Sequence, residues 1–288
     1  MTSDVWFIYN RERLGEKNAN FIAILKEKAE KLNLKIDILD VGRFIISTED
    51  NGKLYYKGEL VKTLPKIAFN RAPSAIELLR FLELKGVNTI NNSESIVTVN
   101  NKFKTHCLFT KHNIKTPKTI YTPSKRISYN TLKGIFGPSF IAKDNTGSLG
   151  EGVFLIKNEN DFKNLPKIKK YIYQEYIESS FGKDLRIIVL GDKILGGVMR
   201  SSSNKKEFRA NLAQGGIAQK IEITKEIEII AKKVQNIFNL EFFGLDLLID
   251  KDGLTVCEIN AVPGLKSFRY IKDVSISEEI YKYIQKEL

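Results

Sequence analysis

Two acidic side chains and one amide near the C-terminus have the types and the spacing of a magnesium site. Asp246 lies inside one apolar run, and Glu258 and Asn260 lie in the next. The turn-like segment 250–253 between the runs predicts an antiparallel pair of strands with Asp246 opposite Glu258. Oxygen ligands favour Mg²⁺, which takes one or two carboxylates while phosphate oxygens complete its shell. A polar strand edge that faces solvent is the alternative reading of the same residues.

A glycine-rich run between two strand-like segments is typical of phosphate binding. It follows Lys143 and contains Gly147, Ser148, Gly150 and Gly152. Glycines let backbone amides approach a phosphate, and the ammonium group of Lys143 could lie over the same oxygens. The run is not a Walker A loop, because no G-K-[ST] sequence follows. A surface hairpin is the alternative.

A third set of residues could bind an acidic substrate. Arg186, Arg200 and Arg209 occur in polar sequence, with Asn211 two positions after the last. Guanidinium groups bind carboxylate and phosphate with two parallel hydrogen bonds, although each arginine alone could be an ordinary surface residue. Nucleophilic catalysis has little support, since no G-x-S-x-G motif occurs and His106 lacks a suitably placed Ser or Cys. We therefore expect a structural role for His106.

The elements around these residues indicate an α/β protein with an α+β body. Short apolar runs alternate with helical patterns over about the first 95 residues, which predicts a small parallel sheet covered by helices. One long helix, from Ser93 as N-cap to His112, should follow, and Thr116-Pro117 should end it. Beyond it the chain is rich in strand patterns, including a hairpin at Gly191-Asp192. No G-x-G-x-x-G follows the first strand, so a dinucleotide-binding fingerprint is absent.

Composition excludes several classes of protein. The 288 residues include 42% hydrophobic and 28% charged residues, typical of a globular chain, and no apolar run approaches the ~18–20 residues of a membrane span. Cys107 and Cys257 are far apart in the sequence, which argues against a disulfide scaffold or zinc module and favours a reducing cytoplasm. The net charge of +12 suits an acidic partner, or reflects a lysine-rich solvated surface.

The order of these motifs resembles that of the ATP-grasp ligases, and most closely their RimK-like branch, the α-L-glutamate ligases. The similarity covers essentially the whole chain, including Asn70-Arg71 near the N-terminus. It rests on the following residues in sequence: Lys102, Lys143, Gln174-Glu175-Tyr176-Ile177, Asp184-Leu185-Arg186, Phe208-Arg209-Ala210-Asn211, Gly244-Leu245-Asp246 and Glu258-Ile259-Asn260-Ala261-Val262-Pro263-Gly264. Single motifs are weakly specific, whereas the ordered set is specific.

The resemblance implies an ATP-grasp fold in three parts. These are a pre-ATP-grasp βαβ domain (1–95), a central lid subdomain (96–173) and a C-terminal subdomain (174–288). It also implies roles for individual residues: Lys102, Lys143 and the glycine-rich loop at the phosphates, Glu175 and Tyr176 at adenine, Asp184 at the ribose, Asp246, Glu258 and Asn260 at two Mg²⁺ ions, and Arg186, Arg200, Arg209 and Asn211 at the γ-phosphate and the acyl substrate. Asn70 and Arg71 could contribute from the N-terminal side.

The implied activity is a carboxylate–amine ligase that uses ATP and Mg²⁺, with Mn²⁺ as a substitute. It would form an amide through an acyl phosphate, adding glutamate to the C-terminus of a peptide, protein or cofactor. Thr146, the segment 265–268 and the serines 201–203 depart from close relatives near the expected acceptor site. A ligase for another amino acid, joined to a small metabolite or peptide, and a non-catalytic basic module for ribosomal or nucleic-acid partners are the alternatives. Direct nucleic-acid binding and membrane association are not expected, and a homo-oligomer stays open.

Overall fold

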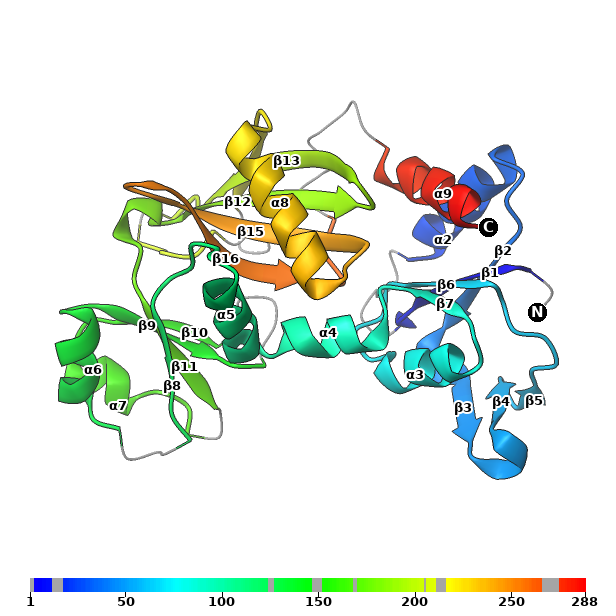
Figure 1. The fold of residues 1–288 in the computed structure, drawn as a ribbon, viewed down its shortest axis with the longest axis horizontal. Helices are drawn as coiled ribbons and strands as arrows, with labels where there is room; N and C mark the ends of the chain where they lie inside the picture. The colour runs from blue at the N-terminus through cyan, green and yellow to red at the C-terminus, as the bar shows by residue number, and fades with distance from the viewer. Residues whose placement is uncertain are drawn as a thin grey trace.

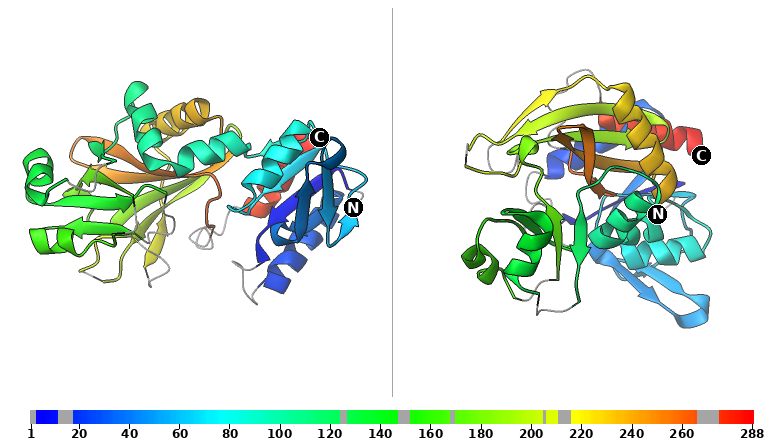
Figure 2. Two further views of the ribbon diagram at one scale, coloured as in Figure 1. Left: turned by 90° about the horizontal axis from the view of Figure 1, so that it is seen from below. Right: turned by 60° about the vertical axis from the view of Figure 1, so that its left-hand side comes forward.

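The computed structural model describes residues 3–11, 18–123, 127–146, 152–167, 170–204, 206–210, 216–265 and 275–288, with only the backbone described for 18–24. Within this part of the chain the strands form an N-terminal, a central and a C-terminal sheet and one small hairpin sheet. The N-terminal sheet lies at one end of an elongated molecule, and the central sheet lies at the other (Figure 2). No helix among these residues has the length and apolar character needed to cross a bilayer.

The N-terminal sheet is parallel and covered on both faces. Its strands run in the order β2 (Ile36–Asp40), β1 (Val5–Tyr9), β6 (Ile67–Asn70) and β7 (Asn88–Ile90). Side chains alternate between the faces of a strand, so Val5 and Phe7 pack in one core with α2 (Asn18–Lys31), while Trp6 and Ile8 pack in another with α3 (Ile76–Leu84). Burial on both faces explains why β1 is a continuous apolar run. The predicted βαβ alternation is confirmed here.

Two features of this region were not predicted. A hairpin sheet of β3 (Phe44–Ser47), β4 (Lys53–Tyr56) and β5 (Glu59–Leu60) lies beside α3, and the short helices η1 (Val41–Arg43) and η2 (Glu49–Asn51) belong to the same segment (Figure 1). The C-terminal helix α9 (Ile276–Glu287) returns to the N-terminal sheet and lies beside α2 (Figure 1). Ile280, Tyr281 and Ile284 are buried there, so the last residues of the chain stabilise its first sheet.

The single helix predicted from Ser93 to His112 is wrong. The chain forms α4 (Ser93–Asn100) and α5 (Lys102–Lys111), which meet at Asn101. Asn101 has an extended backbone, and its side chain accepts a hydrogen bond of 3.0 Å from the amide of Lys104, so it caps α5. The N-cap of α4 is Asn92, not Ser93, whose amide and hydroxyl both donate to Glu83. The break places Lys102 in the first turn of its own helix.

The C-terminal sheet separates an apolar face from a charged one. Its antiparallel strands run in the order β14 (Ile217–Lys220), β13 (Lys193–Ser201), β12 (Lys183–Leu190), β15 (Phe242–Asp250) and β16 (Gly253–Asn260). Leu185, Leu245 and Leu247 pack in one core with α8 (Lys225–Phe238). By strand alternation, Arg186 and Asp246 therefore point to the opposite face. The predicted hairpin at Gly191-Asp192 is confirmed as the connection between β12 and β13.

The central sheet is built in the same manner. Its strands run in the order β10 (Val153–Ile156), β9 (Phe140–Asp144), β11 (Tyr171–Glu175) and β8 (Thr119–Tyr121), followed by η3 (Glu178–Ser180). Phe140, Ala142 and Tyr173 form an aromatic-rich core with α6 (Tyr129–Phe136) and α7 (Glu159–Lys163). Lys143 and Gln174 alternate with these residues and point away from that core, toward α5 and the C-terminal sheet.

Asn91 joins the N-terminal sheet to the C-terminal one. Its side-chain amide donates to the carbonyls of Phe242 (2.5 Å) and Ala261 (2.8 Å). Its carbonyl oxygen accepts from the amides of Glu241 (2.8 Å) and Phe242 (2.9 Å). The residue is 3% exposed, so a single buried side chain satisfies four backbone groups at the start and at the end of the strand pair that carries Asp246 and Glu258.

Replacement of Asn91 should therefore destabilise the fold strongly. We expect Asn91→Ala to lower the free energy of unfolding by about 2–3 kcal/mol, because buried backbone donors and acceptors lose their partners. Asn91→Asp keeps the acceptor but places a buried carboxylate against the carbonyls of Phe242 and Ala261, so it should lower the free energy of unfolding at least as much as alanine does. Denaturant titration measures both values, and an alanine variant within about 0.5 kcal/mol of the wild type, the usual range for surface changes, would contradict this role.

Candidate active site

The predicted pairing of Asp246 with Glu258 is confirmed, and it contains a β-bulge. Asp246 lies opposite Glu258, whereas its neighbour Leu247 lies opposite Val256, which leaves Cys257 as the extra residue. Regular alternation would send Cys257 and Glu258 to opposite faces. Instead Glu258 Oε2 lies 3.0 Å and Cys257 Sγ 4.0 Å from the same atom, Lys143 Nζ. The bulge thus adds a thiol to the site, and nothing in the sequence pattern predicted it.

Two arginines hold the carboxylates on this face. Arg186 donates to Asp246 through Nε and, at 2.7 Å, through Nη2. Arg200 donates to both oxygens of Asp184 at 2.6 Å and lies 3.3 Å from Asp246. Asn260 also contacts Asp246, with its side-chain nitrogen 3.3 Å from Asp246 Oδ2. Strands β12, β13, β15 and β16 therefore bring together five of the residues that the sequence singled out.

Two lysines approach Glu258 from other elements. Lys102, in the first turn of α5, lies 3.5 Å from Oε1, and Lys143, on β9, lies 3.0 Å from Oε2. Both lysine side chains are less than a tenth exposed. The amide of Lys102 also donates to the carbonyl of Asn145, which follows β9 (3.0 Å). Glu258 is thus the point at which the helix, the central sheet and the C-terminal sheet meet.

The charges in this cluster stabilise one another at neutral pH. Removal from water would raise the pKa of Glu258, but Lys143 and Lys102 outweigh it and lower that pKa to about 2. Burial opposes the charge on Lys143, yet the carboxylates of Glu258 and Asp246 raise its pKa, whereas burial lowers the pKa of Lys102. Burial raises the pKa of the Cys257 thiol to about 11. Glu258 is therefore ionised and Cys257 is neutral.

The Asp184–Arg200 pair is ionised as well. Burial raises the pKa of Asp184 to about 6, although Arg200 acts in the opposite direction. The pKa of Arg200 is raised by Asp246 and Asp184 in spite of its burial. Each oxygen of Asp184 accepts a hydrogen bond from Arg200, so a ribose hydroxyl would have to share these oxygens with the guanidinium group.

Other predicted site residues lie elsewhere or outside the described chain. Arg209 follows β13 and is held by Glu207 at 2.8 and 2.9 Å, with its guanidinium over the ring of Phe208. Glu175 is exposed at the end of β11, next to the half-buried Tyr176. The carbonyl of Gly152 accepts from the amide of Asp144, at the base of the glycine-rich run. The remaining predictions, Gly147, Ser148, Gly150 and Asn211, lie outside the described residues.

The donor set fits a magnesium ion that is shared with phosphates. Asp246, Glu258 and Asn260 offer two carboxylates and one amide oxygen from adjacent strands, all hard oxygen ligands. Over the described residues, no group of three or more His, Cys, Asp or Glu side chains is arranged to hold a metal alone. Mg²⁺ commonly takes one or two protein carboxylates and completes its shell with substrate phosphates and water, so these residues suit a nucleotide-bound ion.

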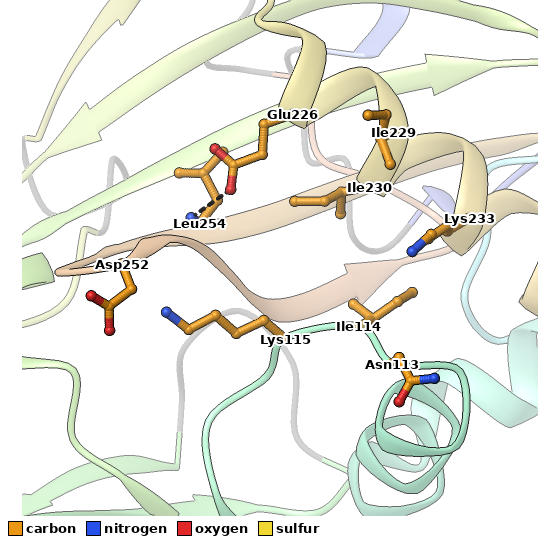
Figure 3. A pocket seen from close by; sticks show the side chains of 9 residues that line it. All are labelled: Asn113, Ile114, Lys115, Glu226, Ile229, Ile230, Lys233, Asp252 and Leu254. Atoms are coloured by element: carbon orange, nitrogen blue, oxygen red, sulfur yellow. Dashed lines mark hydrogen bonds between the residues drawn. The ribbon is translucent and has the colours of Figure 1, made fainter.

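A cavity of about 390 Å³ lies away from this cluster, between α8, the β15–β16 hairpin and the segment after α5 (Figure 3). Two of its four charged residues have partners. Lys115 pairs with Asp250 at 2.9 Å, and Glu226 accepts from the amide of Leu254 at 2.9 Å. The cavity contains none of the carboxylates, lysines and arginines of the cluster described above.

The absence of a side chain at Gly244 lets Pro263 and Arg186 pack against the backbone of β15. A Cβ atom at this position would lie 2.9 Å from Pro263 Cβ and 3.2 Å from Arg186 Nη1. We expect Gly244→Ala to lower the free energy of unfolding by about 1–3 kcal/mol through overpacking. Gly134 in α6 is the matched control, because a Cβ there meets no atom within 4 Å, and alanine favours helix. Denaturant titration of both variants tests this, and a Gly244→Ala protein as stable as Gly134→Ala would refute it.

Comparison with known proteins agrees with this geometry. Residues 99–284 match the family model of the RimK-like ATP-grasp domain. A protein of Methanococcoides burtonii named "Probable alpha-L-glutamate ligase" is 30% identical over 272 residues, covering 91% of this chain and 90% of the relative. A protein of the same name from Mannheimia succiniciproducens is 26% identical over 281 residues, covering 92% and 93%.

The fold also matches solved structures. The ATP-grasp ligase PsnB, complexed with a phosphomimetic variant of its minimal precursor, Mg and ADP, superimposes with a TM-score of 0.73 over 100% of this chain and 99% of PsnB, at 14% identity. At that identity the likeness supports the fold alone, and the family assignment rests on the family model and the relatives. The chain therefore belongs to the RimK-like ATP-grasp family and is an ADP-forming carboxylate–amine ligase.

Proposed function

We propose that this ligase adds glutamate to the C-terminus of a peptide, protein or cofactor through an acyl phosphate, and that it acts in the cytoplasm. The observation that carries the proposal is the cluster in which Lys102, Lys143, Arg186 and Arg200 surround three carboxylates on one face of the C-terminal sheet. The names of the relatives support glutamate as the added amino acid. The net charge of +12 supports an acidic acceptor.

The nucleotide would lie between the central and C-terminal sheets. Lys102, Lys143 and the glycine-rich run would bind phosphate oxygens, and Glu175 and Tyr176 would contact adenine. Asp246, Glu258 and Asn260 would hold two Mg²⁺ ions, or Mn²⁺ in their place. When bound, ATP and these ions supply the phosphoryl group and neutralise its charge. In this arrangement residues 1–95, 96–173 and 174–288 act as the pre-ATP-grasp, lid and C-terminal parts.

The arginines would act on the acid substrate. A carboxylate is a poor electrophile because its charge is delocalised and an oxide ion leaves badly; phosphorylation converts that oxygen into a leaving group that an amine can displace. Arg186 and Arg200 are fixed by Asp246 and Asp184, so their remaining N–H groups are oriented before the substrate arrives, which is the condition for electrostatic stabilisation. We propose that Asp184 orients Arg200 rather than binding ribose, and that Arg209 and Asn211 complete the acceptor side.

Neutralisation of one carboxylate should reduce catalysis by orders of magnitude, and a measurement of folding separates this loss from unfolding. We expect Asp246→Asn and Glu258→Gln each to reduce ADP formation by on the order of 10²–10³-fold, as for loss of a major electrostatic contact in a transition state. Glu228→Gln, an exposed change on α8 with a side chain 49% accessible, is the matched control and should retain full activity. A coupled ADP assay with circular dichroism measures both properties, and turnover that survives in both site variants would exclude this assignment.

The identity of the amino acid needs a separate assay. With Mg²⁺, ATP and a peptide that ends in glutamate, added glutamate should stimulate ADP release, because the fixed arginines suit a carboxylate substrate. Product mass should rise by one or more glutamyl units, which also distinguishes single from repeated addition. Stimulation by lysine or alanine alone would instead favour the same fold acting on another amino acid.

A further inference from the structure

His106 is buried at the junction of the three elements that form the site. It lies one helical turn after Lys102 on α5 and is 3% exposed. Its Nδ1 lies 2.5 Å from Thr116 Oγ1, and its Nε2 lies 2.8 Å from the side-chain nitrogen of Gln174. Thr116 belongs to the segment that leads from α5 to the central sheet, and Gln174 belongs to β11. The sequence predicted a structural role for His106, and these contacts show which elements His106 joins.

The hydrogen bonds of His106 run in one direction. The amide nitrogen of Gln174 is a donor only, and it also donates to Thr119 Oγ1 at 2.8 Å. His106 Nε2 must therefore accept, so the ring proton is on Nδ1 and is donated to Thr116. The hydroxyl of Thr116 then donates to the carbonyl of Val256 at 3.0 Å. The result is a continuous chain of bonds from the central sheet to β16.

The surrounding charges keep this histidine neutral. Burial, followed by Lys143 and Lys102, lowers the pKa of His106 to about 3, against the opposite influence of Glu258. An imidazolium would carry a proton on Nε2 and could not accept from Gln174. The same tautomer and the same direction of donation therefore persist throughout the physiological pH range.

The chain of bonds ends beside residues of the nucleotide site. Gln174 directly precedes Glu175, and Val256 lies two residues before Glu258. The segment between α5 and β8 is also bound to β16 by its backbone, since the amide of Val256 donates to the carbonyl of Lys115 at 2.9 Å. Figure 3 shows this segment, with Ile114 and Lys115, passing alongside β16. His106 thus connects the strand on the adenine side, the helix that carries Lys102 and the strand that carries Glu258.

We propose that His106 is a positioning residue for the nucleotide, which fixes the central sheet and β16 relative to α5 so that Lys102, Lys143 and Glu258 can act on one triphosphate. The proposal rests on the proposed nucleotide site and on no assumption about the amino acid or acceptor. The role proposed for His106 is more than packing, because one neutral side chain bridges elements that carry different parts of the site.

The test is a graded set of variants at position 106. His106→Leu removes both bonds, His106→Gln can keep the contact with Gln174, and His106→Asn can keep the contact with Thr116. We expect the leucine variant to raise the KM for ATP and the Kd for Mg-ADP about tenfold, a change comparable to loss of a buried hydrogen-bonded network, with a smaller effect on kcat. The glutamine and asparagine variants should lie between it and the wild type. His112→Leu, at the exposed end of the same helix, should change neither constant.

A double-mutant cycle separates positioning from general loss of stability. Gln174→Leu should weaken Mg-ADP binding in the wild type but add less than about twofold in the His106→Leu background, because the two residues act through one bond. Fully multiplicative effects, or an unchanged KM and Kd in His106→Leu, would overturn the proposal. If that variant does not fold, Thr116→Val removes only the hydroxyl, and an unchanged Kd for that protein would overturn it equally.

Calorimetric binding of Mg-ADP needs no amino acid and no turnover. A wild type that binds Mg-ADP but adds no glutamate would contradict the proposed substrate while leaving the role of His106 intact. A wild type that binds normally while all the 106 variants also bind normally would contradict the role of His106 alone.

Discussion

Charge compensation on one face of the C-terminal sheet is the interaction on which the site depends. Asp184, Asp246 and Glu258 are largely withdrawn from water there, and each is held by Lys or Arg at 2.6–3.5 Å. An isolated carboxylate in such a position would cost several kcal/mol, so the carboxylates and cations require one another. Four cations, Lys102, Lys143, Arg186 and Arg200, surround these three carboxylates, and N–H groups of the same side chains could also bind a further anion. A triphosphate with its metal ion is an anion that these side chains can share.

Strand alternation and the β-bulge at Cys257 place these charged side chains on one face of the sheet. Every second residue of β12 and β15 packs against α8, so the residues between them, Arg186 and Asp246 included, must point to the other face. The bulge at Cys257 then shifts the register of β16, so that the thiol and Glu258 approach the same lysine. The break at Asn101 gives Lys102 a helix of its own. Asn91 binds the two ends of this strand pair to the N-terminal sheet. Helix α9, from the far end of the chain, packs beside α2 in the core on one face of that sheet.

Features that depend on residues close together in the sequence could be predicted from the sequence. The length of the turn after Asp250 and the apolar runs on either side predicted the pairing of Asp246 with Glu258, and that pairing is confirmed. The helix break was missed because Asn101 lies in an otherwise continuous helical sequence, where only its capping contact with Lys104 shows the boundary. The bulge at Cys257, the packing of α9 on α2 and the bonds of His106 arise from contacts between distant segments. No residue spacing announces such contacts, so they required the three-dimensional structure.

The central claim is that protein carboxylates and nucleotide phosphates hold the metal ions jointly. Electron paramagnetic resonance with Mn²⁺ as a spin probe tests it most directly, because free and bound Mn²⁺ give distinct signals. The account predicts that Mn²⁺ binds tightly to the wild type only when ADP is present, and that Asp246→Asn weakens this binding at least tenfold. Tight binding without nucleotide, or equal binding by the two proteins with nucleotide, would contradict it.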